Sequence, residues 1–184
     1  MIETAADLFL REGYAQTSMD EVMQISRVSK SNIYYHFQGK EDLLLAVVEY
    51  WVDMYETAIA ELVAQHEKTV KERMKAFIDM LTTAINARDC QGGCPFVSLY
   101  VQSPRDAGQV KQRITRFFAE LPPVLTRLFE QGVARGEFRP DVSAASAAAL
   151  FIAALEGALV LAETTQNPEM IQETATHFYQ LLQG

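Results

Sequence analysis

The amino-acid sequence predicts an all-α protein with a small N-terminal helical domain, residues 1–45, and a larger helical domain, residues 46–184. Almost every segment repeats its apolar residues at helical spacing, and no two segments alternate apolar and polar residues as paired strands would. The chain has 184 residues, of which 49% are hydrophobic, so it can bury a sizeable core. It contains no repeat and no low-complexity tract, which favours globular helical domains.

The N-terminal domain begins with a predicted helix over residues 2–12. Leu8 and Phe9 lie on its apolar face, and Gly13 is a stop signal because glycine adopts the left-handed backbone that ends many helices. The domain ends inside a long helix that starts at Lys40, so no flexible linker separates it from the rest of the chain.

Two short helices are predicted between these elements. Thr17 or Ser18 can cap the first of them, and a break over residues 26–28 separates it from a helix over residues 29–37. The second helix is rich in polar and aromatic residues. Two short helices joined by a turn of this length are typical of the helix-turn-helix motif, which places its second helix in the DNA major groove.

The larger domain is predicted to hold the rest of the long helix, to about Gln65, and further helices. These cover residues 70–88, a segment entered through Pro95, and residues 107–135, 143–165 and 168–183. Proline is tolerated at a first helical position, where its missing N–H would have no intrahelical partner. Pro122 and Pro123 predict a break or a kink inside 107–135.

The apolar positions predict how the N-terminal helices pack. Val22 and Ile25 of one helix, with Val28, Ile33 and Phe37 around the next, are expected to pack on the first helix. This packing leaves polar side chains of the second short helix facing away from the core, namely Lys30, Ser31, Asn32, Tyr35 and His36.

The charge distribution agrees with a local binding face. The formal net charge of −8 argues against indiscriminate binding to nucleic acid. Residues 22–40 nevertheless contain Arg27, Lys30 and Lys40 and no acidic residue, so the charge balance inverts over this window. We expect a specific polar ligand there rather than general adhesion to polyanions.

The segment TSMDEVMQISRVSKSNIYYHFQGKEDLL, residues 17–44, resembles the DNA-binding segment of the tetracycline-repressor (TetR/AcrR) family of bacterial transcription regulators. AADLFLREGY resembles the first helix of that family, and the stretch from Gly136 to Ala162 resembles its penultimate region. The resemblance implies that Lys30, Ser31, Asn32 and Tyr35 approach base edges. It implies that Thr17, Ser18, Tyr34, His36 and Lys40 hold phosphates.

Elementary chemistry supports this division of roles. The amide of Asn32 suits adenine, and the ammonium group of Lys30 suits guanine. Hydroxyl groups and the N-terminus of the helix at Lys40 suit phosphate oxygens, which fix register without reading sequence. The alternative for Tyr34 and Tyr35 is that they are ordinary aromatic residues with hydrated hydroxyl groups. His36 can equally bond a neighbouring loop, and Lys40 can be a solvated charge.

Two departures from the family pattern concern DNA binding. The family usually has glycine in the turn where this chain has Arg27, so a left-handed backbone there would cost on the order of 1 kcal/mol. Relatives commonly carry a basic arm before the first helix, whereas Met1 lies almost inside that helix. Either the start is truncated or DNA affinity relies on fewer phosphate contacts.

For the larger domain, the resemblance implies ligand sensing and dimerisation. Large, adaptable side chains near the Gly and Pro breaks are candidates to line a pocket for a small apolar or amphipathic effector. They are Trp51, Tyr55, Phe77, Met80, Phe96, Tyr100, Phe117 and Phe118. The competing interpretation is that they are core residues, as aromatics at helical spacing usually are.

The last two helices are the predicted homodimer surface, because small residues there allow close helix contact and larger ones add apolar area. The candidates are Ala148, Phe151, Ile152, Leu155, Leu159, Phe178 and Leu181. A symmetric pair of subunits would read a palindromic double-stranded DNA operator. The alternative is that these helices pack only within one protomer.

Together these features predict a ligand-responsive repressor, the usual mode of the family that the chain resembles, which a small apolar or amphipathic effector releases from its operator. Two alternatives and an enzyme compare with this prediction as follows. Cys90 and Cys94 favour a thiol-based redox switch, since Cys94 precedes a helix N-terminus and Cys90 can resolve its oxidised form. A helical protein-interaction module without DNA binding would suit the acidic balance. An enzyme is not expected, because no nucleophile elbow, metal pair or phosphate loop is present.

No cofactor and no metal are expected, since two cysteines without a nearby histidine fall short of a zinc site. A cytoplasmic location is predicted because Glu3 and Asp7 are incompatible with a signal peptide. The most apolar run, residues 146–163, is interrupted by Glu156 and Gly157, which favours a buried helix over a membrane span.

Overall fold

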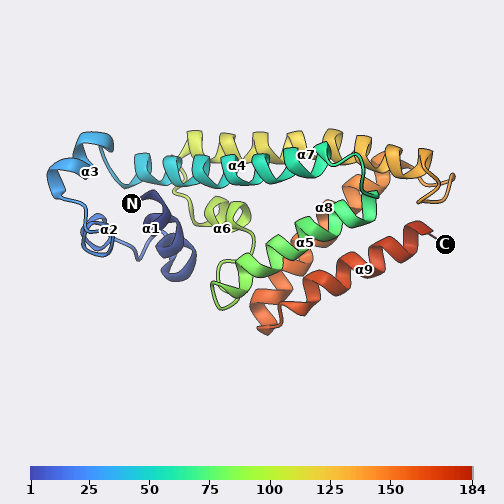
Figure 1. The fold of residues 1–184 in the computed structure, drawn as a ribbon. Helices are drawn as coiled ribbons and strands as arrows, with labels where there is room; N and C mark the ends of the chain where they lie inside the picture. Colours follow the sequence, from blue (N-terminus) through green and yellow to red (C-terminus); the bar gives the residue numbers. More distant parts are fainter. Residues whose placement is uncertain (184) are drawn as a thin grey trace. The chain divides into compact units, whose positions relative to one another are not determined.

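The computed structural model describes residues 1–183, and no strand occurs in this part of the chain (Figure 1). The all-α prediction is confirmed. The elements are α1 (Ile2–Leu8), the π-helical turn η1 (Phe9–Gly13), α2 (Met19–Ser26), α3 (Lys30–His36), α4 (Lys40–Ala64), α5 (Val70–Asn86), α6 (Pro95–Gln102), α7 (Gly108–Ala134), α8 (Ala144–Thr165) and α9 (Glu169–Gln183).

Contacts between residues divide the chain into two compact units. The first unit contains Met1–Tyr55 and Cys94–Phe117, and the second contains Glu56–Gly93 and the chain from Phe118 onward. This grouping differs from a division at residue 45, because α6 and the first part of α7 pack with the N-terminal helices.

Hydrogen bonds fix two points of the first unit, the start of α2 and the residue that follows η1. Ser18 caps α2 by accepting from the Glu21 backbone N–H at 3.1 Å, and the Glu21 carboxylate accepts from the Ser18 N–H, which completes a capping box. The backbone N–H of Tyr14, just after η1, donates to Gln102 Oε1 of α6 at 2.6 Å. α6 therefore fixes the start of the segment that contains α2 and α3, although the two are far apart in sequence.

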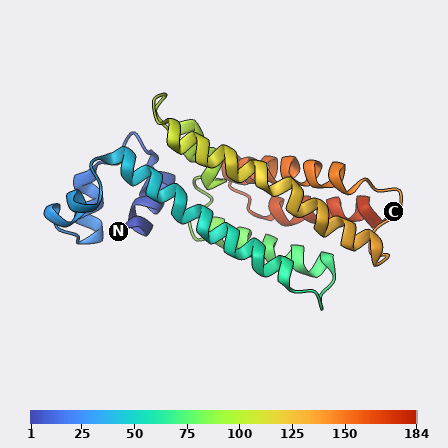
Figure 2. The ribbon, with the colours of Figure 1, turned by 90° about the horizontal axis from the view of Figure 1, so that it is seen from above.

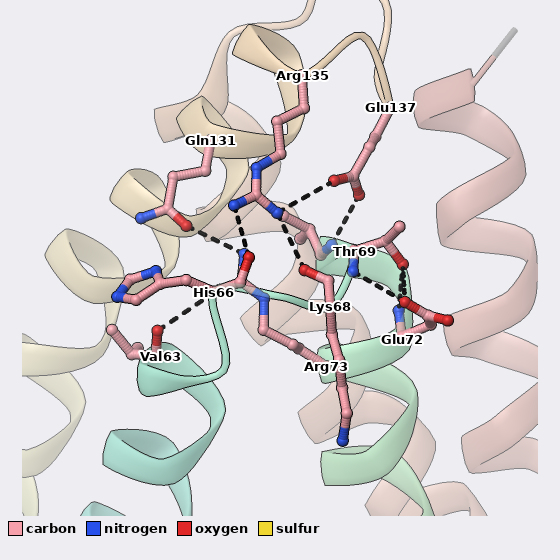
Figure 3. A network of polar contacts seen from close by, with 10 residues as sticks. Val63, His66, Lys68, Thr69, Glu72, Arg73, Gln131, Arg135 and Glu137 are labelled. Atoms are coloured by element: carbon pink, nitrogen blue, oxygen red, sulfur yellow. Dashed lines mark hydrogen bonds and ion pairs between the residues drawn. The ribbon is translucent and has the colours of Figure 1, made fainter.

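The second unit contains a polar network at the turn between α4 and α5 (Figure 3). Arg73 of α5 is 1% exposed, and its guanidinium group donates to the Val63 carbonyl at 3.3 Å and to Gln131 Oε1 at 3.0 Å. Arg135 donates to the carbonyl groups of His66 at 2.8 Å and Lys68 at 3.0 Å. The bond to Val63 satisfies a carbonyl that the end of α4 leaves without a helical donor, and the bonds from Arg135 hold the turn that follows α4.

α8 and α9 lie side by side in both views, and α9 also packs on α5 (Figure 2). Phe129 of α7 contacts three other rings of the core, those of Phe138, Phe151 and Phe178, with centroid distances of 6.0, 6.1 and 5.8 Å. Offset and edge contacts of this kind stabilise a core beyond the area they bury. The aromatic centre of the second unit therefore joins α7, α8 and α9.

Most predicted boundaries agree with the structure within a few residues, and Pro95 takes the first position of α6 as expected. No break occurs at Pro122 and Pro123, because α7 remains helical through both. Pro123 removes the donor to the carbonyl of Ala119, four residues earlier, but Ala119 is exposed and water can satisfy that carbonyl.

One helix among residues 1–183, α8, is long and apolar enough to cross a membrane by length and composition alone. A third of its most apolar window, 33%, is buried inside the protein. Core helices of globular proteins meet the same criterion, so this observation is weak evidence for a membrane span.

Candidate nucleic-acid interface

α3 presents one apolar side chain to the core and its polar side chains to solvent. Ser29 caps the helix by accepting from the Asn32 N–H at 3.3 Å. Ile33 is completely buried, and it anchors the helix on the first unit. The remaining side chains are exposed, and they are Lys30, Ser31, Asn32, Tyr34, Tyr35 and His36. The exposed face of α3 is defined by these six residues.

The exposed face of α3 carries donors and aromatic rings without a carboxylate. Tyr35 is 84% exposed, and its ring lies edge-on to His36 with centroids 4.9 Å apart. Lys30 Nζ lies 5.8 Å from the centre of the Tyr34 ring, one helical turn away. A tyrosine that is this exposed buries little of its ring within the protomer. The exposed face of α3 therefore suits contact with a partner that offers hydrogen-bond acceptors.

The residues before α2 take two different positions. Ser18 is exposed at the N-terminus of α2, where a phosphate oxygen would meet both a hydroxyl group and backbone N–H groups. Thr17 is only 1% exposed, and its hydroxyl donates to the carbonyl groups of Gly13 at 3.0 Å and Leu8 at 3.4 Å. The Thr17 side chain therefore lacks the exposure that a phosphate contact requires.

Lys40 occupies the first position of α4. Its Nζ donates to the carbonyl of Ala15 at 3.3 Å and lies 4.3 Å from the centre of the Tyr14 ring. Burial lowers the pKa of Lys40 below its ordinary value. Lys40 thus has a structural partner on the turn before α2, which the sequence did not indicate.

The turn between α2 and α3 contains Arg27 in the left-handed backbone conformation, at the position where the family usually has glycine. Arg27 has φ 57° and ψ 30° and ends α2 with its N–H bonded to the carbonyl of Met23. A glycine would adopt this conformation at lower cost. Ile25, expected in the core, is 54% exposed, because α2 turns its Val22 side inward and leaves Ile25 beside the turn.

Half of the predicted ligand-pocket residues form one cluster in the first unit. Trp51, Tyr55, Phe96 and Phe117 are buried, and Phe96 stacks on Phe117 with ring centroids 4.1 Å apart. The Tyr55 ring lies 5.1 Å from Phe96 and 6.2 Å from Phe117. Tyr100 belongs to the same unit but is 44% exposed.

The other predicted pocket residues belong to the second unit. Phe77 and Met80 line a groove of about 210 Å³ between the last turns of α4 and the first half of α5, together with Arg73. Phe118 is half-buried on α7. The two sets lie in different units.

The residues predicted at the dimer surface differ in how far they are buried in the protomer. Ala148, Phe151, Leu159 and Phe178 are at most 4% exposed, so they pack inside the protomer and are not available to a partner. The prediction is wrong for these four residues, because they face the core between α7, α8 and α9. Ile152 and Leu155 are half-buried, and Leu181 is 65% exposed.

An exposed apolar stripe runs along α8, where the sequence indicated only that small residues allow close helix contact. Its residues recur at three- and four-residue spacing on one face, and they are Ala149, Leu150, Ala153, Gly157, Val160 and Leu161. Leu150, Val160 and Leu161 are 55%, 45% and 47% exposed. The spacing was visible in the sequence, but α8 is apolar on all sides, and periodicity alone does not say which face is covered.

The two cysteines are buried thiols. Cys90 is 6% exposed and Cys94 is 4% exposed. Cys90 has φ 60° and follows Asp89 with φ 52°, so the backbone before α6 is left-handed at non-glycine residues. Burial limits the access of an oxidant to both sulfur atoms. No group of metal-ligating side chains occurs among residues 1–183.

Comparison with known proteins identifies the family. Residues 1–47 match the family model of bacterial regulatory proteins, tetR family, and residues 70–178 match that of the tetracyclin repressor-like C-terminal domain. The HTH-type transcriptional repressor ComR of Escherichia coli is 21% identical over 174 residues, which cover 95% of this chain and 83% of ComR. The HTH-type transcriptional repressor DhaR of a Mycobacterium species is 22% identical over 183 residues, which cover 99% of this chain and 90% of DhaR.

Solved structures of TetR-family regulators are also similar to this chain. A TetR transcriptional regulator from Chloroflexus aurantiacus is 30% identical, with a TM-score of 0.77 and coverage of 97% of this chain and 90% of that one. Regulatory protein TetR from Rhodobacter sphaeroides is 20% identical, with a TM-score of 0.87 and coverage of 98% and 96%. Homodimer formation and ligand binding are typical of these proteins. The chain belongs to the TetR family of bacterial transcriptional regulators, and it is a DNA-binding regulator and not an enzyme.

Proposed function

We propose that this regulator is a repressor that binds a palindromic DNA operator as a homodimer and leaves it when a small apolar or amphipathic effector binds. The exposed face of α3 carries the proposal. Lys30, Asn32 and Tyr35 project from a short helix that Ile33 fixes in the core. A rigid helix that presents amide, ammonium and phenol groups matches the donor and acceptor pattern of the major groove.

In this proposal, Lys30, Ser31, Asn32 and Tyr35 contact base edges, while Ser18, Tyr34, His36 and Lys40 approach phosphates. Ser18 and Lys40 stand at the N-termini of α2 and α4, where backbone N–H groups favour anions. Thr17 supports the interface indirectly, since its hydroxyl bonds hold the turn between η1 and α2.

Homodimerisation is proposed through the exposed stripe of α8, together with the exposed Leu181 of α9. The stripe offers small residues for close approach and apolar side chains for burial, which a helix pair at a symmetric interface needs. This surface replaces the buried residues that the sequence suggested. Two copies would then present two α3 helices to successive turns of one duplex.

Effector binding is proposed to act through α4, which contributes residues to both compact units. The aromatic cluster of Trp51, Tyr55, Phe96 and Phe117 is a candidate to receive an apolar molecule. A ligand shifts the operator equilibrium only if its affinity differs between the DNA-bound and released states. We propose that the ligand tilts α4 and changes the separation of the two α3 helices. A cytoplasmic location follows from this function.

The proposal is tested by selecting DNA from a random pool with the purified protein and sequencing the bound fraction. The expected result is a palindromic consensus with half-sites about one helical turn apart. Asn32→Ala and Lys30→Ala should each relax selection at one position per half-site and cost about 1–3 kcal/mol of binding free energy. Lys68→Ala, on the exposed α4–α5 turn, is the control and should leave the consensus unchanged. An unselected pool would overturn the proposal.

A further inference from the structure

Arg27 lies in the turn between α2 and α3, at the outer edge of the first unit (Figure 1). Its side chain is exposed, and its guanidinium group makes no hydrogen bond and no ion pair with any of residues 1–183. The contacts proposed for bases and phosphates do not include it. Arg27 is therefore a charged side chain, three residues before the first residue of α3, whose presence the packing of the protomer does not explain.

The backbone of Arg27 is fixed in a conformation that disfavours a side chain. Its φ is 57°, in the left-handed region. The backbone N–H groups of Arg27 and Val28 both donate to the carbonyl of Met23, the latter at 3.2 Å, so the turn is tightly held. Glycine would take this conformation without the steric cost of a Cβ atom. Residues strained in this way cluster at functional sites, where the side chain itself is needed.

Gln166 provides a comparison within the same chain. It ends α8 in the same left-handed conformation, with φ 53°. Its side chain bonds back to its own helix, because Nε2 donates to the carbonyl of Glu163 at 2.8 Å. A bond of this kind gives the Gln166 side chain a local role at the helix end. The Arg27 side chain makes no such bond among residues 1–183, so its role lies outside the protomer.

Arg27 is also the least committed cation of the basic window, residues 22–40. Lys40 Nζ donates to the carbonyl of Ala15, and Lys30 Nζ lies 5.8 Å from the centre of the Tyr34 ring. The window contains no acidic residue that could pair with Arg27. An anion from outside the protein can therefore approach the guanidinium group without displacing a partner.

The dimensions of α3 determine what such an anion would be. Seven residues of α-helix are about 10 Å long, and the major groove of DNA is about 12 Å wide. When the exposed face of α3 occupies the groove, the residues that flank the helix lie near the sugar-phosphate backbone. A planar guanidinium group can donate two parallel bonds to one phosphate. We propose, on the basis of the DNA-binding function proposed above, that Arg27 donates to a phosphate at the edge of each operator half-site.

The test uses a fluorescently labelled duplex that carries the consensus selected by the parent protein, with binding followed by fluorescence anisotropy over a range of KCl concentrations. Arg27→Ala and Arg27→Gly should each weaken binding at least about tenfold at low salt. The plot of log affinity against log salt should become shallower by about 0.9 for each lost phosphate contact, or about 1.8 for a homodimer. The consensus itself should not change, because phosphate contacts carry no sequence information.

The variants separate charge from strain. Arg27→Gly should unfold at a higher urea concentration than the parent, so its weaker DNA binding cannot come from a less stable fold. Arg27→Ala keeps the Cβ atom, which excludes added flexibility of the turn as the cause. Two controls lie in the second unit. Gln166→Gly relieves the same backbone conformation, and Arg127→Ala removes an exposed charge, and both should bind DNA as the parent does.

A neutral methylphosphonate, placed at one phosphate of the duplex at a time, identifies the partner of Arg27. At one position in each half-site it should weaken binding by the parent and leave binding by Arg27→Ala unchanged. Equal losses for the two proteins at every position, or an affinity and salt dependence of Arg27→Ala that match the parent, would overturn this inference and leave the proposed function intact. If the parent binds no duplex from the pool, the proposed function fails and this inference fails with it.

Discussion

Lys40 Nζ lies 4.3 Å from the centre of the Tyr14 ring and 3.3 Å from the carbonyl oxygen of Ala15, so the first residue of α4 is tied to the turn that precedes α2. An ammonium group over an aromatic face is attracted by the ring quadrupole. Lys40 therefore has a folding role that is independent of any phosphate contact.

Replacement of Lys40 by glutamine is expected to lower the free energy of unfolding by about 0.5–2 kcal/mol, because the ring contact and the bond to Ala15 are both weakened. Urea denaturation measures this change. Lys68→Gln removes an equal charge from an exposed site and should change stability by less than about 0.5 kcal/mol. If Lys40→Gln reduces DNA affinity without reducing stability, the phosphate contact is its main role.

Ser18 also has two roles to separate, as the N-cap of α2 and as a proposed phosphate contact. Ser18→Ala removes the N-cap and should cost about 1 kcal/mol of stability. Ser18→Asn keeps a capping oxygen and should restore most of that loss, which separates capping from phosphate contact. Ser146→Ala, at an exposed position inside α8, is the control. DNA binding by Ser18→Asn then shows whether the hydroxyl itself is needed, and a stable Ser18→Ala would contradict the capping role.

Arg27 stores conformational strain between α2 and α3. At φ 57° a side chain is disfavoured, so Arg27→Gly should raise the free energy of unfolding by up to about 1 kcal/mol. Arg27→Ala removes the same charge but keeps the Cβ atom and the strain. Thermal unfolding should therefore rank glycine above arginine, with alanine close to arginine. A gain shared by alanine and glycine would instead indicate that the charge is unfavourable.

The contrast between α2 and α8 shows what the sequence could and could not provide. Caps and breaks are local, so Ser18 and Pro95 marked helix starts without knowledge of the fold. Which face of a helix is buried depends instead on tertiary packing. α2 is amphipathic, yet Ile25 is exposed because the turn at Arg27 ends the covered surface.

α8 is apolar on every side, so its sequence did not distinguish buried from exposed residues, and the predicted dimer surface contained both. The same limit applies to pairs of helices that are far apart in sequence. The bonds from Gln102 to Tyr14 and from Gln172 to Asp79 follow from packing and had no sequence signal. The exposed face of α3 was predictable because one buried isoleucine in a short helix determines where the others point.

Gly132 of α7 is required for the approach of Phe138. A Cβ atom at Gly132 would lie 2.3 Å from the Phe138 ring, which is 3% exposed. Gly132→Ala should therefore destabilise the protein by about 1–3 kcal/mol, although alanine is the better helix former. Urea denaturation tests this, and the double variant with Phe138→Leu should recover part of the loss. An additive loss in the double variant would show that the two sites do not interact.

Gly157 tests the proposed dimer surface. A Cβ atom at this position meets no atom within 4 Å in the protomer, and the residue lies in the middle of the exposed stripe of α8. Gly157→Leu should therefore fold with unchanged helical content by circular dichroism. In a dimer whose α8 helices meet closely, the added side chain should weaken association at least tenfold, which corresponds to about 1.4 kcal/mol. Analytical ultracentrifugation measures the dissociation constant, with Gly108→Leu as the control at another open glycine. A pair of α8 helices that pack closely at Gly157 has no room for the four carbon atoms that leucine adds. Unchanged association of Gly157→Leu would therefore show that the subunits make contact elsewhere.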